Sequence, residues 1–145
     1  MNKKQKSLTN KGFSLVELII VIAIMAVLVG VLAPQYLKYV NNSKVSTDVT
    51  NAQEMATAIN VAIADQKITT GTSATSADTT LSTLMANTSA SVPTSKLGGT
   101  WTVTYDTTNG VSKITLTTTG TDAGTYECYP NPDNTSDGAN AKLKK

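Results

Sequence analysis

The chain has 145 residues, with 12 basic and 10 acidic side chains, no histidine and one cysteine. Without histidine or a second cysteine, the common catalytic triads and tight zinc sites cannot be built, so the composition argues against an enzyme and predicts no cofactor. Four of the twelve lysines lie in residues 1–12, which leaves eight lysines against ten acidic residues in the rest of the chain. A nucleic-acid-binding protein needs a clustered basic face, so this chain is not expected to bind nucleic acid by itself.

A basic N-terminal stub that ends at Lys11-Gly12 is followed at once by an apolar run over residues 13–33, whose single charge is Glu17. As a helix, these 21 residues span about 31 Å, enough to cross a hydrocarbon core of about 30 Å. A carboxylate within such a segment costs roughly 2.5–3.5 kcal/mol on insertion scales. We therefore expect Glu17 to have a function that offsets this cost.

Two simpler kinds of segment share some features of this run. A secretory signal peptide explains the lysines, but its apolar core has about 7–15 residues and precedes a small-residue cleavage site, whereas Pro34-Gln35-Tyr36 follows here. A single-pass anchor with its lysines in the cytoplasm and its C-terminal part outside is physically sound. The anchor interpretation explains neither the glycine at the edge of the run nor Glu17.

The helical pattern continues beyond the apolar run. Pro34 removes a hydrogen bond to the carbonyl of Gly30 and crowds it, which predicts a kink in a helix that otherwise continues. A period of three or four residues then places an apolar stripe on one face, with Asp48 among the polar residues off that stripe. The stripe comprises Leu37, Val40, Val45, Val49, Ala52, Ala56, Ile59 and Ile63. The helix is predicted to extend from Phe13 to about Asp65, a length of about 80 Å.

A mixed segment is expected next. Residues 67–77 are a loop rich in threonine, serine and glycine, and Asp78 is placed to cap a short helix. The buried face of that helix would carry Leu81, Leu84 and Met85.

Alternating apolar and threonine residues then predict strands. The pattern covers residues 100–105 and 114–117, and Asn109-Gly110 between them is a hairpin-turn signal. A third strand is predicted over residues 125–129. The fold class is therefore α+β, with a long N-terminal helix whose outer half packs on a small antiparallel β-meander.

The C-terminal stretch 130–145 is polar and is predicted to be irregular. Asp133 and Asp137 are weak candidates for a metal, because their spacing partly matches a calcium loop, but a solvated turn explains them better. Cys128 cannot form an intramolecular disulfide, and the tyrosines on either side of it favour a buried thiol.

The octapeptide Lys11-Gly12-Phe13-Ser14-Leu15-Val16-Glu17-Leu18, with the apolar run after it, resembles the N-terminus of type IV prepilins and of the related pseudopilins. The resemblance implies a pilin-like fold, cleavage by a prepilin peptidase after Gly12 and methylation of the new amine on Phe13. It also implies that Glu17 pairs with the N-terminal ammonium of a neighbouring subunit. Members of the family have a proline at the position of Pro34, and in their filaments the preceding stretch can lose helical order.

The resemblance divides the chain into four parts. Residues 1–12 are a cleaved leader, 13–34 the transmembrane and filament-core half of the helix, 35–67 its outer half, and 68–145 a head domain. Many Gram-negative pilins close their C-terminal loop with a disulfide that this chain cannot form. That departure, the absence of arginine and the abundance of asparagine and threonine point to a Gram-positive, AT-rich source.

The function that this implies is a structural subunit, the major pilin, of a type IV pilus. The precursor would sit in the cytoplasmic membrane with its head outside and would then enter an extracellular filament. Its partners would be copies of itself, the prepilin peptidase, an assembly platform with an ATPase, and minor pilins. Such filaments serve twitching motility, cell adhesion and DNA capture. Alternatives are a pseudopilin of a type II secretion system, a competence pilin, or a membrane-tethered β-domain that binds a ligand and never polymerises.

Overall fold

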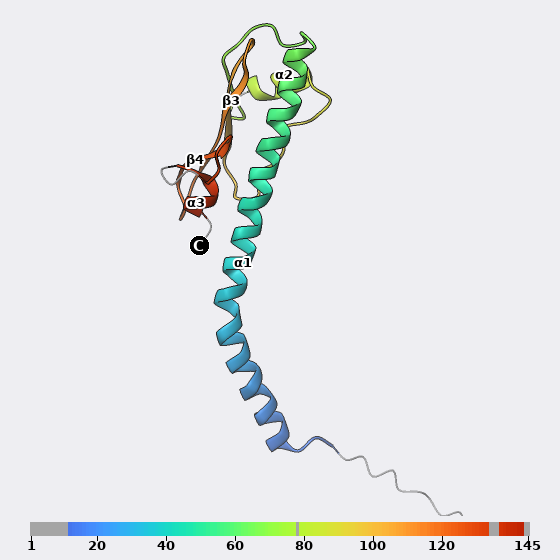
Figure 1. Cartoon of the computed structure of the whole chain (residues 1–145). Coiled ribbons are helices and arrows are strands. Elements are labelled where there is room, and N and C mark those ends of the chain that lie inside the picture. The colour runs from blue at the N-terminus through green and yellow to red at the C-terminus, as the bar shows by residue number, and fades with distance from the viewer. Residues whose placement is uncertain (1–11, 78, 134–136, 144–145) are drawn as a thin grey trace, which may run out of the picture. The chain divides into compact units, whose positions relative to one another are not determined.

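The computed structural model describes residues 12–77, 79–133 and 137–143, so the lysines of the predicted leader lie outside the described residues. One helix, α1 (Leu15–Ala64), runs through the first third of the described chain (Figure 1). Its extent confirms the predicted long helix, and Pro34 lies inside it. The chain forms two compact units, one up to Tyr36 and one from Leu37 onward, which are described in turn.

The first unit is the apolar part of α1. None of its described side chains is buried, and the exposed fractions of its large apolar side chains range from 45% at Val21 to 90% at Phe13. Within the described part of the chain, α1 alone is long and apolar enough to cross a membrane. Among the described residues, this unit therefore has no buried apolar core of its own.

The second unit buries one face of the C-terminal part of α1. Val45, Val49, Ala52, Ala56 and Ile59 of the predicted stripe are buried in the core. The stripe begins later than predicted, because Leu37 keeps 68% of its side chain exposed.

The predicted pattern is wrong at Asp48, which is only 1% exposed although the sequence placed it off the apolar stripe. Its carboxylate accepts hydrogen bonds from the Ser95 hydroxyl at 2.7 Å, the Lys96 amide at 2.8 Å and the Leu97 amide at 3.0 Å. Three donors from one loop thus satisfy a carboxylate that burial would otherwise penalise. Asp48 joins α1 to the segment before the second strand.

Four strands form one antiparallel sheet in the order β1-β2-β3-β4. They are β1 (Ser73–Thr75), β2 (Thr100–Asp106), β3 (Gly110–Thr118) and β4 (Gly124–Tyr129). The last three confirm the predicted meander, including its hairpin turn at Asn109-Gly110. The first strand lies within the stretch that was predicted to be only a loop, and its three residues pair with β2.

The sheet presents alternating side chains to the core. Trp101, Val103 and Tyr105 of β2 are buried, as are Ile114 and Leu116 of β3. These residues belong to the same apolar cluster as the buried face of α1, so the outer half of the helix packs on the sheet as predicted.

Irregularities in the pairing of β3 change the alternation locally. The register shifts between Thr104 and Tyr105, and again between Ile114 and Thr115. The second shift leaves Cys128 of β4 without an opposite residue, and the neighbouring Glu127 and Cys128 are both buried. Such a bulge redirects side chains that would otherwise point to opposite faces.

A short helix, α2 (Thr80–Ala86), connects β1 to the loop that Asp48 holds. Its buried residues are the predicted Leu81, Leu84 and Met85. The N-cap position is occupied by Thr79, whose side chain makes no capping hydrogen bond. The predicted cap, Asp78, lies outside the described residues.

The C-terminal stretch contains a helix, α3 (Ala139–Leu143), that the sequence did not predict. Ala139 and Leu143 are buried, and the Asn41 side-chain amide of α1 donates to the Leu143 carbonyl at 2.8 Å. The Glu127 amide donates to the Asp137 carbonyl at 2.6 Å. Contacts to α1 and β4 therefore order a segment whose own composition is polar.

Candidate assembly site in the N-terminal helix

The apolar surface of α1 is the first component of the candidate site. Fifteen large apolar side chains between Phe13 and Leu32 are exposed. Full burial of such a side chain contributes about 1.5–3 kcal/mol, so covering these half-exposed residues would contribute on the order of 20 kcal/mol. A surface of this kind requires lipid or an apolar protein partner.

Glu17 lies in the first turn of α1. Its Oε2 atom accepts a hydrogen bond from the backbone amide of Ser14 at 2.9 Å. The Leu18 amide donates to the Ser14 carbonyl at 3.1 Å, which places Ser14 at the start of the helix. Glu17 therefore caps its own helix, in the reach-back arrangement of a capping box.

The predicted processing junction lies just before this turn. Gly12 has open space around its Cα, and no heavy atom lies within 4 Å of the position that a Cβ would occupy. Phe13 is 90% exposed and precedes the first helical residue. Both residues are thus sterically accessible in the described part of the chain, while the roles of Gly12 and Phe13 remain predictions.

Pro34 and Gly30 lie within the same continuous helix. The position of a Cβ on Gly30 would also have no heavy atom within 4 Å. Because 17 residues of helix separate Glu17 from Pro34, about 25 Å of axial rise lies between them, and the proline is no part of the Glu17 site. The kink at this point remains a prediction.

The weak metal candidates near the C-terminus are held by different partners. Asp133 accepts from the side-chain amide of Asn140 at 3.0 Å, and Asp137 pairs with the Lys113 ammonium at 2.9 Å. Among the described residues, no group of three or more histidine, cysteine, aspartate or glutamate side chains could hold a metal ion. Residues 134–136 and 144 of the compared calcium pattern lie outside the described residues.

Lys113 joins the last two strands to the C-terminal segment. Besides Asp137, its ammonium lies 3.4 Å from the carboxylate of Glu127. The hydrogen bond that the Lys113 ammonium donates to the Asp137 carboxylate is the main cause that raises the pKa of Lys113, and both carboxylates add a favourable charge interaction. An ion-pair cluster thus joins β3 and β4 to the C-terminal segment.

Cys128 is fully buried, as predicted. Burial raises the pKa of its thiol to about 12, and the negative charge of Asp48 adds to the shift. A thiol with so high a pKa is neutral at physiological pH and therefore a poor nucleophile. Its properties fit a small core side chain.

The contacts of two residues, Ser14 and Asp48, were not predicted from the sequence. Ser14 and Glu17 have the spacing of a capping box. The prediction for Glu17 rested on its charge and did not use this spacing. Asp48 offered no such signal, because its three donors come from a loop about 47 residues away in the sequence. Local pattern can identify the first residue, and only tertiary structure identifies the second.

Comparison with known proteins supports the resemblance in the N-terminal part. Residues 8–33 match the prokaryotic N-terminal methylation motif. Two relatives, each a type IV major fimbrial protein FimA from Dichelobacter nodosus, are 42% and 44% identical to this chain over 57 residues. Each match covers 39% of this chain and 36% of the relative, so the chain spans about a third of the length of these relatives. No solved structure matches the chain.

The predicted resemblance to type IV pilins is thus confirmed by a motif and by relatives that are fimbrial proteins, not enzymes. The α+β fold, with a long N-terminal helix and a small antiparallel sheet, is the fold predicted from that resemblance. Nothing in these matches supports the predicted Gram-positive source.

Proposed function

We propose that this chain is a structural subunit of a type IV pilus, the major pilin, which polymerises through its N-terminal helix. The observation that carries the proposal is the methylation motif over residues 8–33, in which the large apolar side chains from Phe13 to Leu32 are exposed. The named relatives are major fimbrial proteins, which favours a pilin over a pseudopilin or a competence pilin.

The proposed sequence of events begins with insertion into the cytoplasmic membrane, with the head outside. A prepilin peptidase then cleaves after Gly12 and methylates Phe13. An assembly platform with its ATPase extracts the subunit into an extracellular filament, in which minor pilins take part. Because the apolar helix passes from lipid to a bundle of like helices, its side chains avoid transfer to water.

Glu17 provides the polar contact in this proposal. In a low-dielectric bundle its carboxylate would pair with the ammonium of Phe13 from a neighbouring subunit, which offsets part of the cost of burying both charges. Within its own chain, the Glu17 carboxylate already accepts a hydrogen bond from the Ser14 backbone amide. The ammonium adds a second partner to a carboxylate whose position is fixed by this cap.

Two variants separate the charge of Glu17 from its capping role. Glu17→Gln keeps an N3 side chain that can accept from the Ser14 amide, whereas Glu17→Ala removes both the acceptor and the charge. We expect both variants to be processed and to form few filaments, scored by electron microscopy and by the amount of subunit in sheared material. Glu54→Gln, an exposed carboxylate further along α1, is the matched control and should assemble normally.

Normal filament formation by Glu17→Gln would contradict the ion-pair role and leave only helix capping. Mass spectrometry of the mature subunit tests the earlier steps. A chain that begins with methylated Phe13 supports the proposal, whereas a chain that retains residues 1–12 indicates a membrane-tethered domain.

A further inference from the structure

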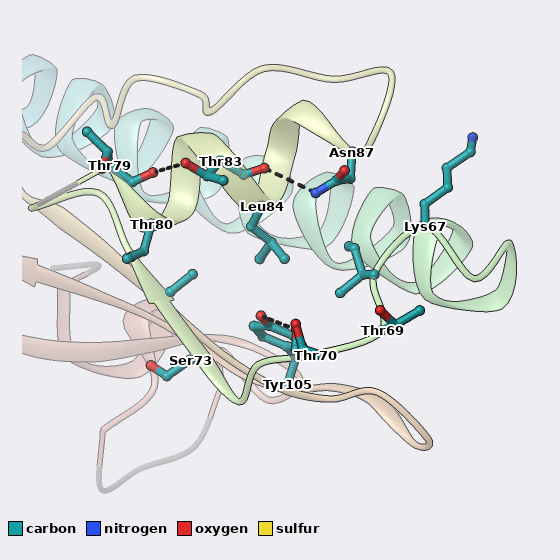
Figure 2. Close-up of a pocket in the computed structure, with 12 residues that line it drawn as sticks. Lys67, Thr69, Thr70, Ser73, Thr79, Thr80, Thr83, Leu84, Asn87 and Tyr105 are labelled. Atoms are coloured by element: carbon teal, nitrogen blue, oxygen red, sulfur yellow. Dashed lines mark hydrogen bonds between the residues drawn. The ribbon is translucent and has the colours of Figure 1, made fainter.

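The head domain contains a pocket of about 380 Å³ that the filament proposal does not use. Its walls come from the loop after α1, from β1, from α2 and from Tyr105 of β2 (Figure 2). Its volume is within the range of about 300–1,000 Å³ that is typical of small-molecule sites. All of its lining residues belong to the second unit.

The inner wall of the pocket is apolar and buried. Ile68, Ala74, Leu84 and Tyr105 line it, and each belongs to the buried core. The Tyr105 hydroxyl donates to the Thr70 carbonyl at 3.3 Å, which fixes the ring against the loop after α1. A ligand would therefore meet a preformed apolar floor.

The rim of the pocket consists of hydroxyl and amide groups. The side chains of Thr69 and Thr70 make no hydrogen bond within the described residues, and Thr83 donates only to the Thr79 carbonyl at 2.8 Å. Figure 2 shows Thr70 beside Tyr105 and Asn87 at the end of α2, whereas the Ser73 side chain extends from the other side of β1. A hydroxyl accepts as well as donates, so this rim can bind a ligand that has several hydroxyls.

The described lining contains no carboxylate and a single cation, Lys67. The Lys67 ammonium lies 3.5 Å from the Asp65 carboxylate, and Figure 2 shows its side chain extending away from the pocket. A phosphate or another strong anion would therefore find no dedicated counter-charge among the described lining residues. The pocket favours a neutral polar ligand.

The edge of the sheet beside the pocket is closed to a peptide strand. The Thr80 hydroxyl accepts from the Thr75 amide at 2.9 Å and donates to the Thr75 carbonyl at 3.3 Å. Addition of a strand to β1 needs these same backbone groups. This contact disfavours a protein segment as the ligand.

We propose that the pocket lined by Thr70, Thr83 and Tyr105 binds a neutral saccharide, one or two sugar units long. The C–H face of a sugar ring would lie on the apolar floor, and its hydroxyls would bond to the threonine hydroxyls of the rim. The proposal does not depend on polymerisation, because the pocket is complete in one chain. It would give the subunit a ligand of its own, beyond its structural role.

Binding can be measured on the full chain in a detergent that has no sugar headgroup. Ligand-observed NMR with galactose, N-acetylglucosamine and lactose should show saturable, millimolar binding, with weaker binding of glucuronate. Thr70→Val and Thr83→Val should each weaken binding by about fivefold, the effect of one lost hydrogen bond. Trp101 fluorescence checks that the variants are folded.

Thr57→Val is the matched control, because Thr57 is an exposed helical threonine whose hydroxyl donates to the carbonyl four residues before it, as that of Thr83 does. It should leave binding unchanged. The proposal is overturned if no neutral sugar binds saturably, or if the control weakens binding as much as Thr83→Val. It is also overturned if glucuronate binds more tightly than the neutral sugars, or if cross-links from Thr70→Cys in filaments place a neighbouring subunit in the pocket.

Discussion

Replacement of Asp48 by alanine is the most informative test of the fold. The substitution removes the acceptor of two backbone amides, Lys96 and Leu97, and of the Ser95 hydroxyl. A buried donor left without an acceptor costs about 1–3 kcal/mol. The two amides alone would cost about 2–6 kcal/mol, and we expect about 3 kcal/mol because the partly buried loop can admit water.

Trp101 provides the assay. It is the single tryptophan of the chain, it is buried, and its ring N–H donates to the Pro93 carbonyl of the loop that Asp48 holds, at 3.0 Å. Denaturant unfolding of the detergent-solubilised chain, followed by this fluorescence, gives the free energy of unfolding from the midpoint and slope.

Two further variants set the scale of the measurement. Asp48→Asn keeps the volume and one acceptor, so it should cost less than alanine, about 1–2 kcal/mol. Asp65→Ala removes an exposed carboxylate at the end of α1 and should change the free energy of unfolding by less than about 0.5 kcal/mol. If Asp48→Ala is no more destabilising than Asp65→Ala, the carboxylate does not hold the loop and the reasoning is wrong.

Three further outcomes are expected in the head domain. Gly110→Ala should lower the midpoint of denaturant unfolding more than Gly120→Ala. The two glycines have similar φ values, 87° and 89°, but a Cβ on Gly110 would lie 2.4 Å from the Asn60 Oδ1 atom, whereas the space beside Gly120 is open. Native Cys128 should resist iodoacetamide at pH 8 and react only after unfolding, since burial raises its pKa to about 12; rapid labelling of the native chain would refute this. Because the pKa of Lys113 is raised in the fold, the contribution of its ion pairs to the free energy of unfolding should be present at neutral pH and should be lost as the pH rises above 10.5. The Lys113→Met variant should not show this loss.

The sequence predicted those elements whose side chains repeat with a clear period. The long helix followed from an apolar run and a stripe, and the meander followed from alternating threonine and apolar residues around Trp101. The first strand was missed because Ser73-Ala74-Thr75 has no alternation of its own and is a strand only by pairing with β2. The helix α3 was missed because its order depends on burial of Leu143 and on Asn41, which is 102 residues away.

The candidate site was predictable to a different degree. Glu17 could be identified from the sequence, because a single charge in an apolar run is costly and local. Its contact with Ser14 was also encoded locally, in the spacing of a capping box. By contrast, the sugar-sized pocket combines residues from four elements, and no periodic pattern relates Thr70 to Thr83 or Tyr105. Only the folded chain brings these hydroxyls together.

Asp48 and Glu17 show how one chain can separate folding from assembly. Asp48 accepts from three donors within its own head, so its carboxylate is satisfied as soon as the head folds. Glu17 accepts one backbone amide, and the four lone-pair sites of a carboxylate leave room for a further donor. If the chain polymerises as we propose, that donor is the ammonium of Phe13 from another copy. Loss of Asp48 should then lower head stability while single folded subunits remain competent to assemble, whereas loss of Glu17 should lower assembly and leave the Trp101 unfolding transition unchanged.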